Sequence, residues 1–156
     1  MRALTIWQPW ASLIMIGAKP IEFRDWDYRT RYPKVEGARI VIQAGARPVK
    51  LAEVEDMLAR CWSYGRLTPF GAAALPLLQR LQAAYKCRGV VELAAGLGTA
   101  VLGTPRLIDG LFDKPDSDRL MHHQWAWPLS DIEPFAAPVP ARGAQGFWHW
   151  PGGNRS

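Results

Sequence analysis

The sequence predicts a single α+β domain in which short strands form a small, strongly curved sheet or barrel beside two or three helices. Its 156 residues, of which 49% are hydrophobic, suffice for one buried core. The 14 glycines and 13 prolines divide the chain into short elements, which is not typical of a helix bundle. Short strand-like segments stand around the helical ones, and this combination favours a small barrel.

The N-terminal part begins with a strand and a helix. Ala3–Ile6 is a short apolar segment typical of a strand. Pro9 lies where the first turn of a helix tolerates proline, and apolar residues then recur at near-helical spacing from Trp10. The pattern stops at Gly17, a residue that commonly ends helices. We therefore expect a helix between Pro9 and Gly17.

Two further strands are expected after this helix. Pro20–Arg24 alternates in residue type, with its apolar side chains on one face and those of Glu22 and Arg24 on the other. Asp25–Gly37 is polar and is expected to be a loop. In Ala38–Ala44 the two isoleucines are expected to face the core, while Arg39, Val41 and Gln43 face the opposite side.

The middle of the chain predicts two helices. Lys50–Trp62 has apolar residues at i, i+3, i+7 and i+10, which form a stripe on one helix face. A second helix, opened by Thr68-Pro69 or by Leu75-Pro76, is expected to run to about Tyr85. The segment Gly89–Ala94 that follows is strand-like.

The C-terminal part is divided by glycine and proline. Gly96–Gly110 is ambiguous, and Gly96-Leu-Gly98 is expected to be a turn because it lacks the spacing of a dinucleotide or phosphate-binding motif. Asp109–Arg119 is expected to be an acidic surface loop. Three short segments bounded by prolines are candidate strands: His122–Leu129, Phe135–Val139 and Phe147–Trp150.

The whole chain has a formal net charge of +5, and its basic residues are concentrated in the first two thirds of the sequence. Between Tyr28 and Lys50, Glu36 is the sole acid among six basic residues, and Met57–Val91 holds five more basic residues and no acid. Aromatic side chains lie between these charges, a composition typical of proteins that bind phosphate backbones and stack bases. The alternative is an ordinary solvated basic surface.

Several other classes are not expected. No apolar run approaches the ~20 residues of a membrane-spanning helix. Gln8 and Pro9 interrupt the N-terminal apolar stretch, so we expect no secretory leader and a cytoplasmic protein that does not act at a membrane. Cys61 and Cys87 cannot form a disulfide framework. The adjacent histidines His122-His123 would point to opposite faces of a strand, so we expect no metal site, and we expect no cofactor.

Four segments carry a specific pattern: Leu4–Ile14 with Gln-Pro-Trp-Ala, Gly17–Arg24 with Gly-x-Lys-x-x-Glu-x-Arg, Arg88–Leu93, and Trp125–Leu129 followed by Pro138–Trp148. Together they resemble the ASCH family, the domain named for activating signal cointegrator homology, which belongs to the PUA-like superfamily. The resemblance is weak over residues 50–87, where the two helices look like an insertion. It implies one domain over residues 1–156, an α+β fold with a PUA-like barrel of about five or six strands and flanking helices, and a cleft lined by the Gly-x-Lys-x-x-Glu-x-Arg signature.

The resemblance does not decide the function, because members of the family are associated with RNA or DNA binding, with RNA cleavage, and with deacylation of N4-acylcytidine nucleosides. In the deacylating branch a threonine three residues after the lysine serves as nucleophile, and this sequence has Glu22 there. It also has Gln43 where the family usually has a histidine. A hydrolase of this kind must therefore use Glu22 as the general base for water and Lys19 as the electrostatic stabiliser.

The signature residues also suggest a chemistry of their own. Positive charges at Lys19 and Arg24 favour an ionised Glu22, which can accept a proton from water or from a ring N–H. Lys19 can bind a phosphate or stabilise an oxyanion. Gln8 can read a base edge, and Trp10 can stack on a base. The alternatives are a structural ion pair between Glu22 and Arg24, and a core position for Trp10.

From these residues we expect a domain that recognises RNA, single-stranded nucleic acid or a modified nucleoside in a basic cleft. The cleft is expected to be flanked by further basic residues: Arg29, Arg31, Arg39, Arg47 and Lys50. The rival is a hydrolase in the same cleft, either an N4-acylcytidine amidohydrolase with Lys19 and Glu22 as catalytic residues, or a ribonuclease. A third hypothesis is a protein-interaction domain that binds its partner through the aromatic C-terminal part.

Overall fold

The computed structural model describes residues 1–63, 73–86, 94–108 and 124–152. Within these ranges it contains three α-helices, two short 3-10 helices and seven strands, so the predicted α+β class is confirmed. The predicted acidic loop and the histidine pair lie outside the described residues. So does the predicted strand Gly89–Ala94, apart from Ala94.

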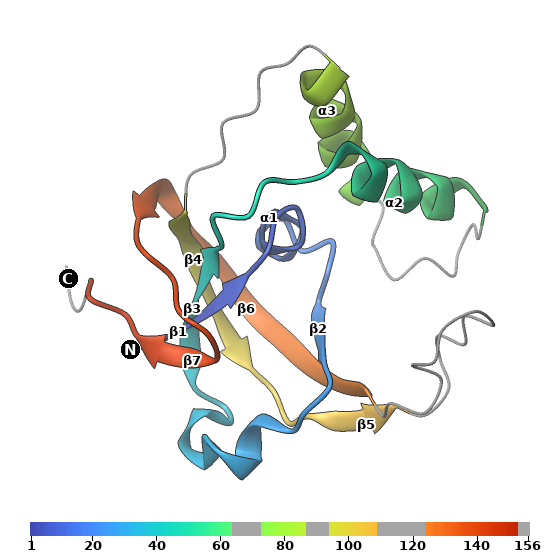
Figure 1. The fold of residues 1–156 in the computed structure, drawn as a ribbon. Coiled ribbons are helices and arrows are strands. Elements are labelled where there is room, and N and C mark those ends of the chain that lie inside the picture. The colour runs from blue at the N-terminus through green and yellow to red at the C-terminus, as the bar shows by residue number, and fades with distance from the viewer. Residues whose placement is uncertain (64–72, 87–93, 109–123, 153–156) are drawn as a thin grey trace.

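The strands form one strongly curled sheet that resembles half of a barrel (Figure 1). Six of them follow the order β2-β6-β4-β3-β1-β7, and β5 pairs with β6. Among the described strands, β1 and β3 pair in parallel, and the other pairs are antiparallel. The strands are β1 (Arg2–Ile6), β2 (Ile21–Arg24), β3 (Arg39–Ala44), β4 (Ala95–Leu102), β5 (Arg106–Ile108), β6 (Gln124–Pro140) and β7 (Phe147–His149).

Strand β6 is the element that curls the sheet. Its first part pairs with β2 and β5, and its later part pairs with β4, with two register irregularities along the β4 ladder. The candidate strands His122–Leu129 and Phe135–Val139 are therefore parts of one strand, as far as they are described. Pro134, which lies between them, does not end the strand, because the register against β4 shifts beside it and the missing N–H of proline is tolerated there.

Strand β4 corrects the expectation of a turn at Gly96-Leu-Gly98. These glycines lie in the middle of the sheet, between β3 and β6. A Cβ atom at Gly98 would overlap the backbone of Glu133 and Pro134, and one at Gly96 would overlap the ring of Trp150. The glycines allow close approach of neighbouring segments rather than a chain reversal.

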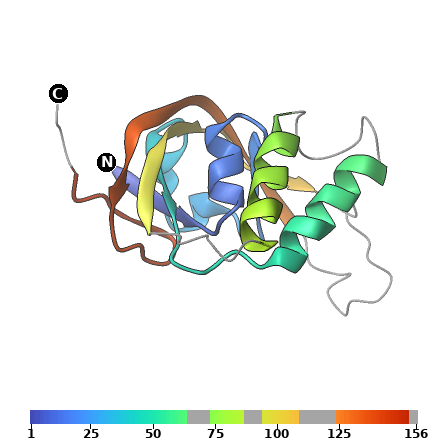
Figure 2. The same ribbon diagram turned by 90° about the horizontal axis from the view of Figure 1, so that it is seen from above.

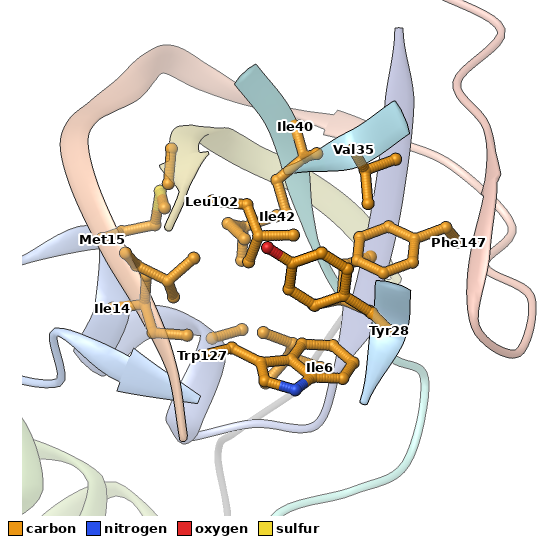
Figure 3. Packing of buried hydrophobic residues seen from close by; sticks show 14 of the residues in the cluster. Ile6, Ile14, Met15, Tyr28, Val35, Ile40, Ile42, Leu102, Trp127 and Phe147 are labelled. Atoms are coloured by element: carbon orange, nitrogen blue, oxygen red, sulfur yellow. The ribbon is translucent and has the colours of Figure 1, made fainter. Parts of the chain in front are cut away.

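The main core lies inside the curl of the sheet (Figure 3). The two isoleucines of β3 point into it, as predicted. Trp127 of β6 packs edge-on against Tyr28 and stacks on Phe147 of β7, with ring centroids 5.1 and 5.8 Å apart. β6 and β7, which are far apart in the sheet order, thus meet around one aromatic cluster inside the half-barrel.

The segment Asp25–Gly37 is more than the polar loop that we expected. It contains two 3-10 helices, η1 (Tyr28–Thr30) and η2 (Pro33–Val35). The side chain of Tyr28 is fully buried, and its hydroxyl donates a hydrogen bond to the carbonyl oxygen of Gly103, at 2.8 Å. Val35 is also buried in the core, and Trp26 and Tyr32 pack against it, so this segment is attached to the core by several side chains.

The outward face of β3 is also covered. Val41 is buried in a small cluster with Ala3 and Trp150. The side-chain amide of Gln43 is fully buried and donates hydrogen bonds to the carbonyl oxygens of Ala44 and Ala141. The C-terminal part of the chain thus packs on the back of the sheet.

The helices lie on one side of the sheet, with α1 between the strands and the pair formed by the other two (Figure 2). They are α1 (Trp10–Met15), α2 (Leu51–Ser63) and α3 (Ala74–Lys86). The start of α3 agrees with the Leu75-Pro76 alternative. Leu13 and Ala18 join the apolar faces of α2 and α3 in a second buried cluster. None of the described helices has the length and apolar character needed to cross a membrane.

Candidate functional site

A pocket of about 360 Å³ opens where the end of β1, the start of α1 and strand β2 meet. No ladder joins β1 to β2 among the described strands, so the pocket lies at the open seam of the half-barrel. Three of its lining residues belong to the Gly-x-Lys-x-x-Glu-x-Arg signature. The lining residues are Thr5, Ile6, Trp7, Trp10, Lys19, Glu22, Phe23 and Arg24.

The end of α1 places Lys19 at this seam. Gly17 has a positive φ of 73°, a conformation that glycine adopts without strain. The amide of Gly17 bonds to the carbonyl of Ile14 and that of Ala18 to the carbonyl of Leu13, which is the hydrogen-bond pattern of a Schellman cap. The chain therefore reverses sharply after the helix, and Lys19 lies between α1 and β2.

Lys19, Glu22 and Arg24 form one charged cluster. The Lys19 ammonium lies 2.5 Å from Glu22 Oε2 and also donates to the carbonyl oxygen of Ile21, at 2.7 Å. The other carboxylate oxygen, Oε1, lies 3.0 Å from Arg24 Nε. The expected ion pair between Glu22 and Arg24 is therefore present, and it is shared with Lys19.

Burial decides the electrostatics of this cluster. The side chains of Lys19 and Glu22 are each 9% exposed, and that of Arg24 is 31% exposed. Burial lowers the pKa of Lys19 below its usual value, although the neighbouring Glu22 carboxylate opposes this shift. The Lys19 ammonium therefore holds its proton less firmly than a surface lysine does.

Arg24 and Trp127 connect this cluster to the core. Glu22 and Trp127 are directly paired across β2 and β6, so their side chains lie on the same face of the sheet. The Arg24 guanidinium lies 6.0 Å from the Trp127 ring and donates from Nη2 to the carbonyl oxygen of Thr5, at 3.2 Å. Arg24 therefore bridges the seam between β2 and β1.

Two buried donors near this cluster make no hydrogen bond within the described part of the chain, Arg24 Nε and Trp127 Nε1. In Figure 3 the indole nitrogen of Trp127 lies on the side of its ring that faces away from Ile40 and Leu102.

Aromatic side chains form the rest of the pocket wall. Trp7, 55% exposed, and the half-buried Trp10 and Phe23 line it. The Arg47 guanidinium lies 4.1 Å from the Trp7 ring and 5.9 Å from the Trp10 ring. Glu53 at the start of α2 holds Arg47 through Nη2, at 2.7 and 2.8 Å. The predicted insertion thus contacts the pocket wall through Arg47.

Two of the sequence-based candidates have local structural partners. The side-chain oxygen of Gln8 accepts a hydrogen bond from the amide of Ser12 in the first turn of α1, at 3.1 Å, and Gln8 does not line the pocket. Trp10 is neither fully buried nor free, because it packs against both core clusters and also lines the pocket.

The other basic candidates do not gather around the pocket. Arg29 forms a salt bridge with Asp27 at 2.8 Å. Arg39 lies at the opposite end of β3 from the pocket and pairs with Glu133 at 3.3 Å. The remaining two also lie outside the lining: the exposed Arg31, whose guanidinium is 5.7 Å from the Trp26 ring, and the exposed Lys50, which directly precedes α2. None of these four residues lines the pocket, and Arg39 is separated from it by the length of β3.

Sequence reasoning missed Trp7, Phe23 and Trp127 as parts of this site. Trp7 directly precedes the Gln-Pro-Trp-Ala motif, and Phe23 lies inside the second signature, so proximity to the motifs was an available signal. Trp127 is distant in sequence, and only strand pairing brings it beside Glu22.

No group of three or more His, Cys, Asp or Glu side chains in the described part of the chain could hold a metal ion. A scan of the chain against protein-family models finds no match, and a search of curated proteins finds none.

Proposed function

We propose that this pocket recognises a single nucleobase, presented by a free or modified nucleoside or by an exposed nucleotide of an RNA strand. The observation that carries the proposal is the combination of three aromatic side chains with a charged cluster in one concave site. A volume of about 360 Å³ is in the range of small-molecule sites. Proteins recognise unstacked bases by aromatic stacking and by hydrogen bonds to their polar edges.

The positions of the charges favour one base over a long strand. Strand binding requires a series of free basic side chains along a groove. Here Arg29 and Arg39 are paired with acids and lie outside the pocket, and Arg47 is held by Glu53. The exposed Arg31 and Lys50 also lie outside the pocket lining, so we propose that most of the recognition energy comes from the pocket.

We also propose that the chain is an ASCH domain of the PUA-like superfamily. The curled sheet with helices on one side is consistent with a small barrel of that kind. The signature residues Lys19, Glu22 and Arg24 lie together in a pocket, as the resemblance implies for its cleft. A solved structure of the chain that superimposes on an ASCH domain would support this assignment, and a different strand order would contradict it.

Binding can be tested by titrating nucleosides while following tryptophan fluorescence. We expect Trp7→Ala to weaken binding by about tenfold or more, because stacking contributes ~1–3 kcal/mol per base. Trp7→Phe keeps a ring and is expected to retain most of the affinity. Leu107→Ala, at an exposed apolar residue outside the pocket, is the matched control. Equal affinities of wild type and Trp7→Ala would contradict base stacking in this pocket.

A hydrolase is the second candidate, and the buried contact between Lys19 and Glu22 favours it. In an N4-acylcytidine amidohydrolase, water would add to the acyl carbonyl, and cytidine and a carboxylic acid would leave. Lys19 would stabilise the developing oxyanion, with Glu22 as the base for water. Both carboxylate oxygens of Glu22 already contact cations, so this base must exchange one contact for the water. A ribonuclease would use the same groups on a phosphodiester.

The hydrolase proposal is tested by chromatography of N4-acetylcytidine and its longer-acyl analogues after incubation with the protein. Release of cytidine by the wild type, and none by Lys19→Ala, would support an amidohydrolase. Absence of release from every analogue would contradict that activity. The same assay on a short RNA would reveal cleavage if the protein is a ribonuclease.

A further inference from the structure

The pocket contains more positive than negative charge. Lys19 and Arg24 are two cations, and Glu22 is the carboxylate between them. Arg47, the next cation near the pocket wall, does not add to this excess, because Glu53 neutralises it through two contacts. A positive charge without a counterion beside apolar rings is costly, and an anionic ligand would offset that cost.

Arg24 is the cation that a ligand can reach. Its side chain is 31% exposed, whereas that of Lys19 is 9% exposed and already bonded to Ile21 and Glu22. Nε of Arg24 is buried beside Glu22, whereas Nη2 makes one long bond to Thr5 and Nη1 makes no hydrogen bond in the described part of the chain. The guanidinium group is therefore held in place by its neighbours with donor capacity to spare. Arginine is the side chain best suited to bind a phosphate through paired donors.

The aromatic rings lie beside this charge. Trp7, Trp10 and Phe23 line the same pocket as Arg24. A ligand that satisfies both features has a flat ring and an anionic group. This is the chemistry of a nucleoside phosphate.

We infer that the ligand of this pocket is a nucleoside phosphate, with its base against Trp7 and Trp10 and its phosphate on Arg24. This inference rests on the proposed recognition of a nucleobase and adds the phosphate to it. The phosphate belongs either to a free mononucleotide or to the adjacent phosphodiester of a strand. An uncharged nucleoside fills the aromatic part of the pocket and leaves the positive charge unpaired.

Calorimetric titration of the wild-type protein tests this directly. The probes are cytidine, adenosine and uridine, their 5′-monophosphates, the corresponding dinucleoside monophosphates, and inorganic phosphate alone. We expect a monophosphate or a dinucleoside monophosphate to bind about tenfold tighter or more than its nucleoside at low salt, since a charge-assisted contact is gained. The probe that gains affinity identifies the free nucleotide or the phosphodiester as the source.

Two variants assign the gain to Arg24. Arg24→Gln is expected to remove the difference between nucleoside and nucleotide. Arg60→Gln is the matched control, because Arg60 is similarly exposed and lies on α2, where it pairs with Asp56. The comparison of ligands on the wild-type protein remains decisive if Arg24→Gln does not fold.

The outcomes separate this inference from the proposed function. Equal affinity for a nucleoside and its phosphates overturns the inference and leaves base recognition intact. Binding of inorganic phosphate as tightly as of the nucleotides, or binding of none of the probes, contradicts the proposed function itself.

Discussion

At the residue scale, Glu22 is the centre of the site. Its two carboxylate oxygens contact two different cations, and its side chain is almost fully buried. A buried ion pair contributes little net stability when it is intact, because desolvation offsets the attraction. Removal of one partner is costly, since it leaves a buried charge uncompensated.

We therefore expect Glu22→Gln to reduce the free energy of unfolding by about 3–5 kcal/mol at neutral pH. In this variant Lys19 would remain buried but would no longer lie beside a carboxylate. Since that carboxylate raises the pKa of Lys19, the pKa would fall further without it. The unfolded chain would then bind more protons than the folded chain, and stability would rise with pH towards about 10.5. The difference in the free energy of unfolding between the wild type and Glu22→Gln should therefore become smaller as the pH rises.

Urea unfolding at a series of pH values measures this effect. Glu133→Gln is the matched control: it breaks the salt bridge with Arg39, in which the Glu133 side chain is 67% exposed. We expect the control to change the unfolding free energy by less than about 1 kcal/mol. A deficit of Glu22→Gln that does not vary with pH would count against a buried, charged Lys19.

At the element scale, the buried phenol of Tyr28 is one of the side chains that fix the segment between β2 and β3 to the core. Tyr28 of η1 packs on Trp127 and Phe147 and donates to Gly103 at the end of β4. Burial raises the pKa of Tyr28 to about 12 from its usual value of 10.0. The charged phenolate is therefore disfavoured in the folded protein.

This shift predicts a loss of stability in alkali. Because the pKa of Tyr28 is higher in the folded protein than in the unfolded chain, the neutral phenol contributes to the free energy of unfolding. This contribution is complete below about pH 10 and is lost as the pH rises towards about 12. We expect Tyr28→Phe to cost about 1 kcal/mol at neutral pH and to show a smaller alkaline loss. Denaturant unfolding and the absorbance of the phenolate measure both effects. If the free energy of unfolding of Tyr28→Phe falls with pH in alkali as steeply as that of the wild type, Tyr28 is not the group responsible for the alkaline loss of stability.

At the scale of the whole molecule, the half-barrel places the candidate site at its seam. The sheet order leaves β2 and β7 at its ends, and the pocket opens between β2 and β1. Arg24 spans this seam through its bond to Thr5, while α1 and the segment before α2 supply the aromatic and basic wall. Elsewhere in the described part of the chain, Arg29, Arg39 and Arg60 are paired with acidic side chains.

This arrangement predicts a weak salt dependence. For a single strand, log affinity falls with log salt by about 0.7 per phosphate contacted. We expect a slope near that of one or two phosphates for a short RNA, because Arg24 is the accessible cation in the pocket. Titrations at several salt concentrations measure the slope. A value typical of about six phosphates would indicate a long basic groove instead.

Elements that are specified by neighbouring residues could be predicted from the sequence. The strand Ala3–Ile6, the helix that ends at Gly17 and the strand that carries Glu22 follow from alternation, helical spacing and a glycine cap. The charge pair of Glu22 with Arg24 followed from their common face on one strand. In each case the interacting residues lie within a few positions of one another.

What the sequence by itself determined, then, is the α+β class, the N-terminal elements and the charged signature of the site. Only the tertiary structure decided that Gly96 and Gly98 lie in a central strand, since their role is the close approach of Trp150 and Glu133. It also placed Trp127 beside Glu22 and separated Arg39 from the pocket. The physical reason is that curling of the sheet and strand register depend on contacts between distant residues, which no local pattern records.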